Sequence, residues 1–215
     1  PWDRTLQIKV VKGFMKEGDT ITVRFGVTEH GGSGMRLQTF CENRFEFRVL
    51  VDPIATYNFQ TLPNQPAISI VPGPPEIWVA VIPSTITCGE TFSLKIKAED
   101  IWGNPTNQAV KTLIPKTNKP IKNLPEFINI KEGNFATVVS GLMVNSAGAL
   151  EIKLYSPDGS LVATCNPSKV FDSSILKNYW GDLHGQSEET LGTNSAADYF
   201  AFGRDCAFLD ACAHQ

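Results

Sequence analysis

The sequence predicts a mainly β protein of two β-sandwich modules followed by one strand–helix–strand unit. Three observations support this fold class. Short segments that alternate apolar and polar residues recur about every ten residues, as sandwich strands do. A Pro-Gly-Pro-Pro stretch at 72–75 divides them into two series and predicts a stiff interdomain hinge. After residue 174 the alternation ends, and an apolar segment, a helix signal and a second apolar segment follow.

Composition bounds the architecture and the partners. A chain of 215 residues is long for one sandwich and sufficient for two small domains. The net charge of −3 and the lack of a long apolar run argue against nucleic-acid and membrane partners. The chain begins at Pro1 and stops at Gln215 directly after an apolar run. We therefore expect the front end of a longer polypeptide, with the remainder of that polypeptide as its main partner.

The first module is expected to span residues 1–72. Its strands are predicted at 5–11, 20–25, 35–40 and 45–51, with turns between them. The last of these alternates most strictly. Its apolar set, expected to face the first core, is Phe45, Phe47, Val49 and Val51.

The second module is expected to span residues 76–170. Strands are predicted at 77–82, 91–98, 129–131, 135–139 and 150–154. The polar stretch 106–127 carries three prolines and predicts a long loop with at most one irregular strand. The Gly-Glu pair at 89–90 and the Asp-Ile-Trp-Gly-Asn-Pro turn at 100–105 resemble features of bacterial immunoglobulin-like modules. The resemblance implies an immunoglobulin-like sandwich here.

Five cysteines occur without any Cys-x-x-Cys spacing, which argues against a structural zinc site or a redox motif. We expect them to behave as small buried hydrophobic residues. A disulfide between two of Cys41, Cys88 and Cys165 is the alternative.

The segment 174–215 changes character. Ser195 followed by Asp198 forms a capping box that predicts a helix of about three turns. The following residues 209–213 form a short, mostly apolar run, as in a strand buried on both faces. Strand, helix and strand in this order predict a β-α-β unit with parallel pairing.

Two of the three histidines, His184 and His214, fall at the carboxyl ends of the two strands of this unit. In parallel α/β barrels that end carries the chemistry, and two imidazoles on adjacent strands could share a metal ion. Gln186 and Glu188 are candidate auxiliary ligands, and Glu189 on the same loop could supply a carboxylate instead. The alternatives are ordinary strand-end histidines and a solvated polar loop. No catalytic residue is assigned.

The segment 179–187 reads Tyr-Trp-Gly-Asp-Leu-His-Gly-Gln-Ser. It resembles the opening of a bacterial family known only as a domain of unknown function, which is related to the PHP (polymerase and histidinol phosphatase) metal-dependent hydrolases. The PHP pattern opens with Asp-Leu-His-x-His, and its second strand ends in Asp-His. Here Gln186 stands for the second histidine of the first motif. His214 matches the second motif, while Ala213 replaces its aspartate.

The resemblance implies that the segment 174–215 is the truncated start of a PHP-like α/β barrel. It implies a divalent metal (zinc, manganese or iron) in the full-length protein, a phosphoester substrate, and His184, His214, Gln186 and Glu188 as metal ligands. The alternative function is a non-catalytic binding or structural β-sandwich protein. We expect residues 1–215 alone to be inactive and to hold metal weakly or not at all, because two ligands do not fill a catalytic site. The apolar segment should dock on the second sandwich or on its own missing remainder, or pair with another copy of itself in a homo-oligomer.

Overall fold

A computed structural model describes residues 5–215, so the first four positions of the predicted first module lie outside the described residues. The protein is mainly β, with 36% of residues in strands and 5% in one helix. Contacts divide the chain into one compact unit that ends at Gln38 and a second unit, Thr39–Gln215. Domain boundaries at 72 and 76 stay a prediction.

The described part of the first unit, residues 5–38, contains turns but no strand. One turn is closed at both ends, because the Asp19 amide donates to the Lys16 carbonyl and the Lys16 amide to the Asp19 carboxylate. The strands predicted at 5–11, 20–25 and 35–40 are absent, so these predictions were wrong. Alternation produces a strand only where a neighbouring strand and a core accept it, and here side chains such as Val11 and Phe14 remain exposed.

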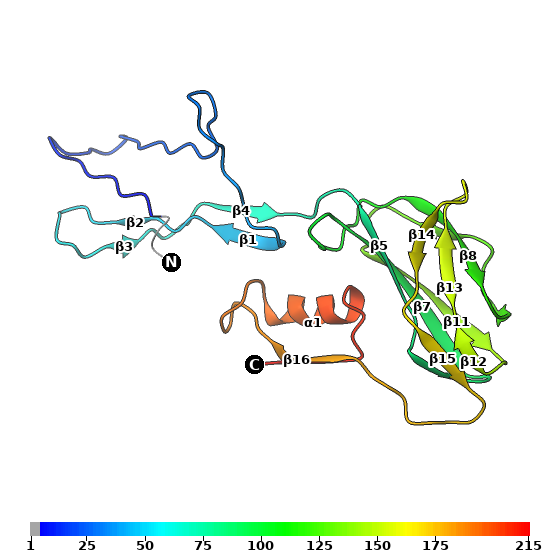
Figure 1. Cartoon of the computed structure of the whole chain (residues 1–215). Coiled ribbons are helices and arrows are strands. Elements are labelled where there is room, and N and C mark those ends of the chain that lie inside the picture. Colours follow the sequence, from blue (N-terminus) through cyan, green and yellow to red (C-terminus); the bar gives the residue numbers. More distant parts are fainter. Residues whose placement is uncertain (1–4) are drawn as a thin grey trace. The chain divides into compact units, whose positions relative to one another are not determined.

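Residues 42–70 form two small antiparallel sheets (Figure 1). They pair β1 (Glu42–Glu46) with β4 (Ala67–Ile70), and β2 (Leu50–Val51) with β3 (Gln60–Thr61). The predicted alternation is confirmed for Phe45, Phe47 and Val49, which are half-buried, but Val51 is exposed. The single strand predicted at 45–51 is divided between β1 and β2. Of the described residues before Ala80, none is buried, so a first sandwich with its own core stays a prediction.

The segment 77–171 holds eleven strands in three sheets. The sheet orders are β5-β7-β11-β9, β10-β8-β13-β14 and β12-β15-β6. All pairings are antiparallel except that of β15 with β6. The strands are β5 (Ile77–Val81), β6 (Thr85–Thr87), β7 (Thr91–Glu99), β8 (Lys111–Thr117), β9 (Ile121–Lys122), β10 (Ile128–Ile130), β11 (Ala136–Val144), β12 (Gly148–Leu150), β13 (Ile152–Tyr155), β14 (Leu161–Thr164) and β15 (Ser168–Phe171). The strands predicted at 77–82, 91–98, 129–131 and 135–139 are confirmed. The one predicted at 150–154 is divided at Glu151 between β12 and β13, which belong to different sheets.

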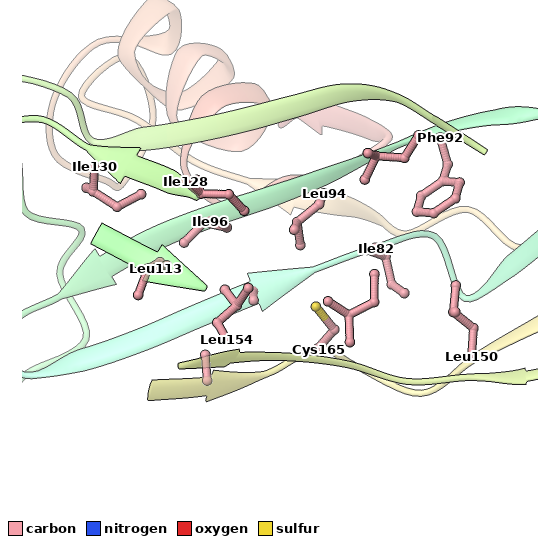
Figure 2. Close-up of a cluster of buried hydrophobic side chains, with 14 of the residues drawn as sticks. Ile82, Phe92, Leu94, Ile96, Leu113, Ile128, Ile130, Leu150, Leu154 and Cys165 are labelled. Carbon is pink, nitrogen blue, oxygen red and sulfur yellow. The ribbon is translucent and has the colours of Figure 1, made fainter. Parts of the chain in front are cut away.

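One hydrophobic core lies between these sheets (Figure 2). Strand β7 buries every second residue, with Leu94 and Ile96 nearly inaccessible to solvent. From the facing sheet, Leu113 of β8 and Leu154 of β13 reach the same cluster. Each such side chain contributes about 1.5–3 kcal/mol when fully buried. This core makes the second module the stable body on which the rest of the Thr39–Gln215 unit is built.

Strand β8 corrects the prediction of a long loop at 106–127. It is regular, and it pairs with β10 on one side and β13 on the other. Its Pro115 lies opposite Leu154 of β13, beyond the three residues that pair with β10. Proline is tolerated where a strand is locally at an edge, because the missing N–H leaves no ladder bond unmade there.

Asp100, which is almost fully buried, organises the loop after β7. Its carboxylate accepts hydrogen bonds from the backbone amides of Gly73 (3.0 Å), Trp102 (2.8 Å) and Asn104 (3.0 Å). Burial raises the pKa of Asp100, but these donors outweigh it and hold the pKa below its ordinary value. The Asn104 side chain in turn bonds the backbone of Cys41 and Thr39. The proline-rich stretch is therefore fixed to the second module at Gly73.

All five cysteines are free thiols. Cys165 in the core and Cys206 at the end of the helix are buried, as the sequence predicts, whereas Cys41, Cys88 and Cys212 are only half-buried. Burial raises the pKa of the Cys165 thiol to about 12.

The chain ends in the predicted β-α-β unit, made of β16 (Gly181–Gly185), α1 (Ala196–Asp205) and β17 (Ala211–His214). The two strands are parallel, which confirms the predicted pairing, and α1 runs alongside β16 (Figure 1). Ser195 and Asp198 form the predicted reciprocal capping box. No helix within residues 5–215 is long and apolar enough to cross a membrane.

Candidate functional site at the carboxyl ends of β16 and β17

The register of β16 and β17 sets which side chains can meet. Asp182 lies opposite Cys212, and Gly185 lies opposite His214. Between these two pairs β16 has two residues, Leu183 and His184, whereas β17 has one. The extra residue of β16 forms a β-bulge at Leu183 and His184. The bulge keeps both paired positions of β16 on the face covered by α1. A Cβ on Gly185 would lie 2.0 Å from the Tyr199 ring, and the Asp182 carboxylate also interacts with Tyr199.

His184 occupies this bulge and is exposed. Its amide donates to the Asp182 carboxylate at 2.9 Å, so Asp182 braces the backbone of the bulge. The structure thus places His184 and His214 at the same end of adjacent strands, as the sequence predicts. The two positions differ in one respect: His184 lies in the bulge, whereas His214 is paired with Gly185 in the regular ladder.

His214 is half-buried and has a defined environment on the α1 side. Its Nε2 lies 2.7 Å from the hydroxyl of Ser187. The rings of Tyr199 and Phe200 lie beside it, with centroids at 6.1 and 6.4 Å. The two rings also contact each other, so they form one aromatic wall beside the imidazole. Among residues 5–215, Ser187 is the hydrogen-bonding partner of the ring.

Ser187 is completely buried, and its loop holds it from several directions. Its carbonyl accepts from the amides of Thr190 (2.9 Å) and Gly192 (2.8 Å). A Cβ on Gly192 would lie 2.7 Å from the Gln186 carbonyl oxygen, so only glycine lets the loop close this tightly. The Ser187 hydroxyl donates to the carboxylate of Glu189. The loop therefore buries the hydroxyl between a carboxylate and an imidazole.

Glu189 is fixed at its other side by the helix. Both of its carboxylate oxygens accept from the backbone amide of Ala196, at 3.2 and 3.0 Å. The Ser187 hydroxyl, then the Ala196 amide, hold the pKa of Glu189 below its usual range, and the nearby His214 adds to this. An ionised carboxylate at a helix N-terminus also complements the helix dipole. Glu189 is consequently a fixed negative charge close to His214.

Tyr199 closes the site from the helix. Its hydroxyl donates to the Ala213 carbonyl at 3.3 Å, and its ring lies directly on the backbone of Gly185. Burial raises the pKa of Tyr199, and the Asp182 carboxylate raises it further. The phenol therefore remains protonated and acts as a structural donor.

The predicted ligands do not assemble into a metal centre within the described chain. Gln186 is half-buried and Glu188 is exposed; the amide of Glu188 donates to the Asn194 carbonyl. Across residues 5–215 no three His, Cys, Asp or Glu side chains converge so as to hold a metal ion. A catalytic zinc-type site takes three protein ligands. The residues of this chain alone therefore do not fit the metal that the resemblance implies.

The β-α-β unit contacts the second module through Phe208. The ring is buried, and the ammonium groups of Lys95 and Lys97 on β7 each lie 5.5 Å from its centroid. Phe208 adopts φ +61°, a left-handed conformation that usually selects glycine at a helix end. The ion pair between Lys177 and Glu90 (2.7 Å) adds a second link. Between these contacts lies a cleft of about 320 Å³.

The sequence does not indicate the contact between Ser187 and His214, and Glu189 was one of two possible carboxylates on this loop. A period of two starting from His184 places Gln186 with the histidine and Ser187 on the opposite face. The bulge shifts this phase, so Ser187 joins His214 instead. Most residues of the loop 187–194 are polar, so the sequence carries no signal that separates Ser187 from its neighbours.

Comparisons with known proteins give relatives of unstated function. No protein-family model matches the chain. A Chlamydia muridarum protein described as "Uncharacterized protein" is 27% identical over 200 residues, which cover 90% of this chain and 32% of that protein. Proteins of Chlamydia trachomatis and Chlamydia pneumoniae, described likewise, are 26% and 24% identical, with 90% and 89% of this chain and 32% of each protein covered. The chain spans about a third of the length of these curated relatives.

Solved structures show distant likeness only. The D00-D0 domain of intimin gives a TM-score of 0.34 at 10% identity, over 51% of this chain and 57% of that chain. The C-terminal domain of ZirS gives 0.32 at 18% identity, over 67% and 99%.

Proposed function

We propose that this chain is the N-terminal part of a metal-dependent hydrolase related to the PHP phosphoesterases. In this proposal β16, α1 and β17 begin an α/β barrel, and the β modules, the second of them immunoglobulin-like, hold that barrel in place. The observation that carries the proposal is the parallel pairing of β16 with β17, with His184 and His214 at their carboxyl ends. Catalytic residues of such barrels gather at that end.

The donor set indicates where the rest of the site must come from. His184 and His214 are the proposed metal ligands, with Gln186 or Glu188 auxiliary. Because the described residues bring no three strong donors together, further ligands have to be supplied from outside residues 5–215. The relatives, about three times as long as the matched region, support a longer parent protein. The remainder of the polypeptide is then the main partner of this chain.

The contacts of Phe208 support a scaffolding role for the second module. Burial of that ring against β7, together with the Lys177–Glu90 ion pair, joins the β-α-β unit to the stable core. A module that holds the first two strands would orient the barrel relative to its substrate. Pairing with a second copy is the alternative way to cover the exposed apolar side chains of α1, such as Phe202.

The test compares a full-length parent protein with residues 1–215. We expect the full-length protein to hold manganese, zinc or iron, measured by elemental analysis, and to hydrolyse a generic phosphodiester. Replacing His184 or His214 by Ala should remove most of the metal and the turnover, whereas His30→Ala, an exposed turn residue, should change neither. Residues 1–215 alone should show no turnover above the His184→Ala control. A metal-free, inactive full-length protein would favour a non-catalytic binding or structural role.

A further inference from the structure

The protons around Ser187 can be assigned from the hydrogen bonds. A serine hydroxyl has one proton, and the Ser187 hydroxyl contacts both a carboxylate oxygen of Glu189 and Nε2 of His214. An ionised carboxylate only accepts, and the Ala196 amide already donates to both oxygens of Glu189. The serine proton therefore points to Glu189. Its oxygen must then accept from His214, so Nε2 of His214 carries a proton.

We propose that Glu189 and Ser187 are positioning residues that hold His214 with its proton on Nε2 and leave Nδ1 as the nitrogen that meets a ligand. Among the residues that the structure describes, none forms a hydrogen bond with Nδ1. The tautomer follows from the geometry of this chain alone. The use of Nδ1 toward a substrate or cation rests on the proposed function.

The arrangement is more than helix capping. The N-terminus of α1 already has the capping box of Ser195 and Asp198, and Glu189 adds a bond to the first helical amide, Ala196. That bond requires neither the Ser187 hydroxyl nor its complete burial. A buried hydroxyl is stable only when its hydrogen-bonding groups find partners. Here the carboxylate of Glu189 accepts from the hydroxyl, while the Glu189 amide (3.3 Å) and Nε2 of His214 lie at its oxygen, so the serine links a fixed charge to the imidazole.

Tyr199 and Phe200 add to the restraint, because their rings contact each other and lie together beside the imidazole. A half-turn of the His214 ring about the Cβ–Cγ bond would place Cε1 where Nε2 lies and break the bond to Ser187. Within a half-buried site this would leave the Nε2 proton without its acceptor, which is unfavourable. We therefore expect one ring orientation and one tautomer.

Nitrogen NMR of the metal-free 215-residue chain tests this directly, at a pH where the ring is neutral. Long-range proton–nitrogen spectra should show the shift of a protonated nitrogen for Nε2 of His214 and of an unprotonated nitrogen for Nδ1. The Nε2 proton should exchange slowly enough to be observed. His30 and His184, which are exposed, should exchange fast and provide internal references.

Two variants separate positioning from capping. Ser187→Ala keeps the Glu189–Ala196 bond, yet it should abolish the slowly exchanging Nε2 proton. Glu189→Gln keeps an acceptor for Ala196 and should weaken the same signal, while Glu188→Gln should leave it unchanged. Backbone amide spectra establish that each variant is folded. A proton on Nδ1 of His214, or an unchanged His214 spectrum in folded Ser187→Ala, would overturn the proposal. Because the test uses no metal and no substrate, its outcome is independent of whether the full-length protein is a hydrolase.

Discussion

Phe208 offers a quantitative test of how the β-α-β unit is held to the second module. Phe208→Ala removes a buried ring while leaving a Cβ at φ +61°, so the backbone strain is unchanged. Complete removal of a buried Phe costs about 3–5 kcal/mol, and the loss includes roughly 0.5–1 kcal/mol for each lysine near the ring. Because flexible lysine stems can close part of the cavity, we expect the lower end, about 3 kcal/mol.

This loss should be local. Hydrogen exchange of the amides in β16 and β17 should accelerate about a hundredfold, since each 1.4 kcal/mol is a factor of ten, while the core strand β7 stays protected. Phe208→Gly should be milder by about 1 kcal/mol, because glycine adopts positive φ without strain. Phe202→Ala on the exposed side of α1 is the matched control. Unchanged exchange in Phe208→Ala, or a glycine variant that is worse than the alanine variant, would refute the reasoning.

Three further changes test other parts of the structure. Gly185→Ala places a Cβ 2.0 Å from the Tyr199 ring, so it should cost about 1–3 kcal/mol in denaturant unfolding; in a Tyr199→Ala background most of that cost should vanish, and simple additivity would contradict the contact. The pKa of Asp100 is lower in the folded protein than its ordinary value near 4 in the unfolded chain, so the ionised carboxylate stabilises the fold above about pH 4, and this stabilisation is lost as the pH falls through the folded pKa. Asp100→Asn should therefore flatten the dependence of unfolding free energy on pH below about pH 4, and an unchanged acid dependence would exclude this role. The Cys165 thiol, with a pKa raised to about 12, should resist a thiol reagent at pH 8 in the native protein and react once urea unfolds it; fast native labelling of Cys165 would contradict its burial.

Much of the second module was predictable because its alternating segments find neighbouring strands and a core that covers their apolar face. Strand β7 alternates in sequence and in burial, and the capping box at Ser195 correctly predicts α1. In contrast, residues 5–11 alternate equally well but form no strand, because local pattern says nothing of whether a core is present. Strand β8 was not predicted because it contains Pro115. A proline is tolerated there only because the pairing of β8 with β10 ends before it, which the sequence does not show.

The candidate site was predictable in its location and not in its contacts. The end of each parallel strand follows from sequence order, so His184 and His214 were placed at one rim. A bulge depends on how two strands match in three dimensions, and here it decides that Ser187 meets His214. Period-two reasoning cannot detect one inserted residue.

The parallel pairing of β6 with β15 has a consequence for how the protein folds. The Ser168 hydroxyl donates to the Pro83 carbonyl, and these residues are 85 positions apart in the chain. Closing so long a loop costs entropy before the pair gains any contact, so such pairings slow folding. During synthesis β6 must wait for nearly the whole module to emerge. We therefore infer that the β6–β15 contact forms late. The β-α-β unit, which follows β15 in the chain, can dock on a completely folded second module only after this step.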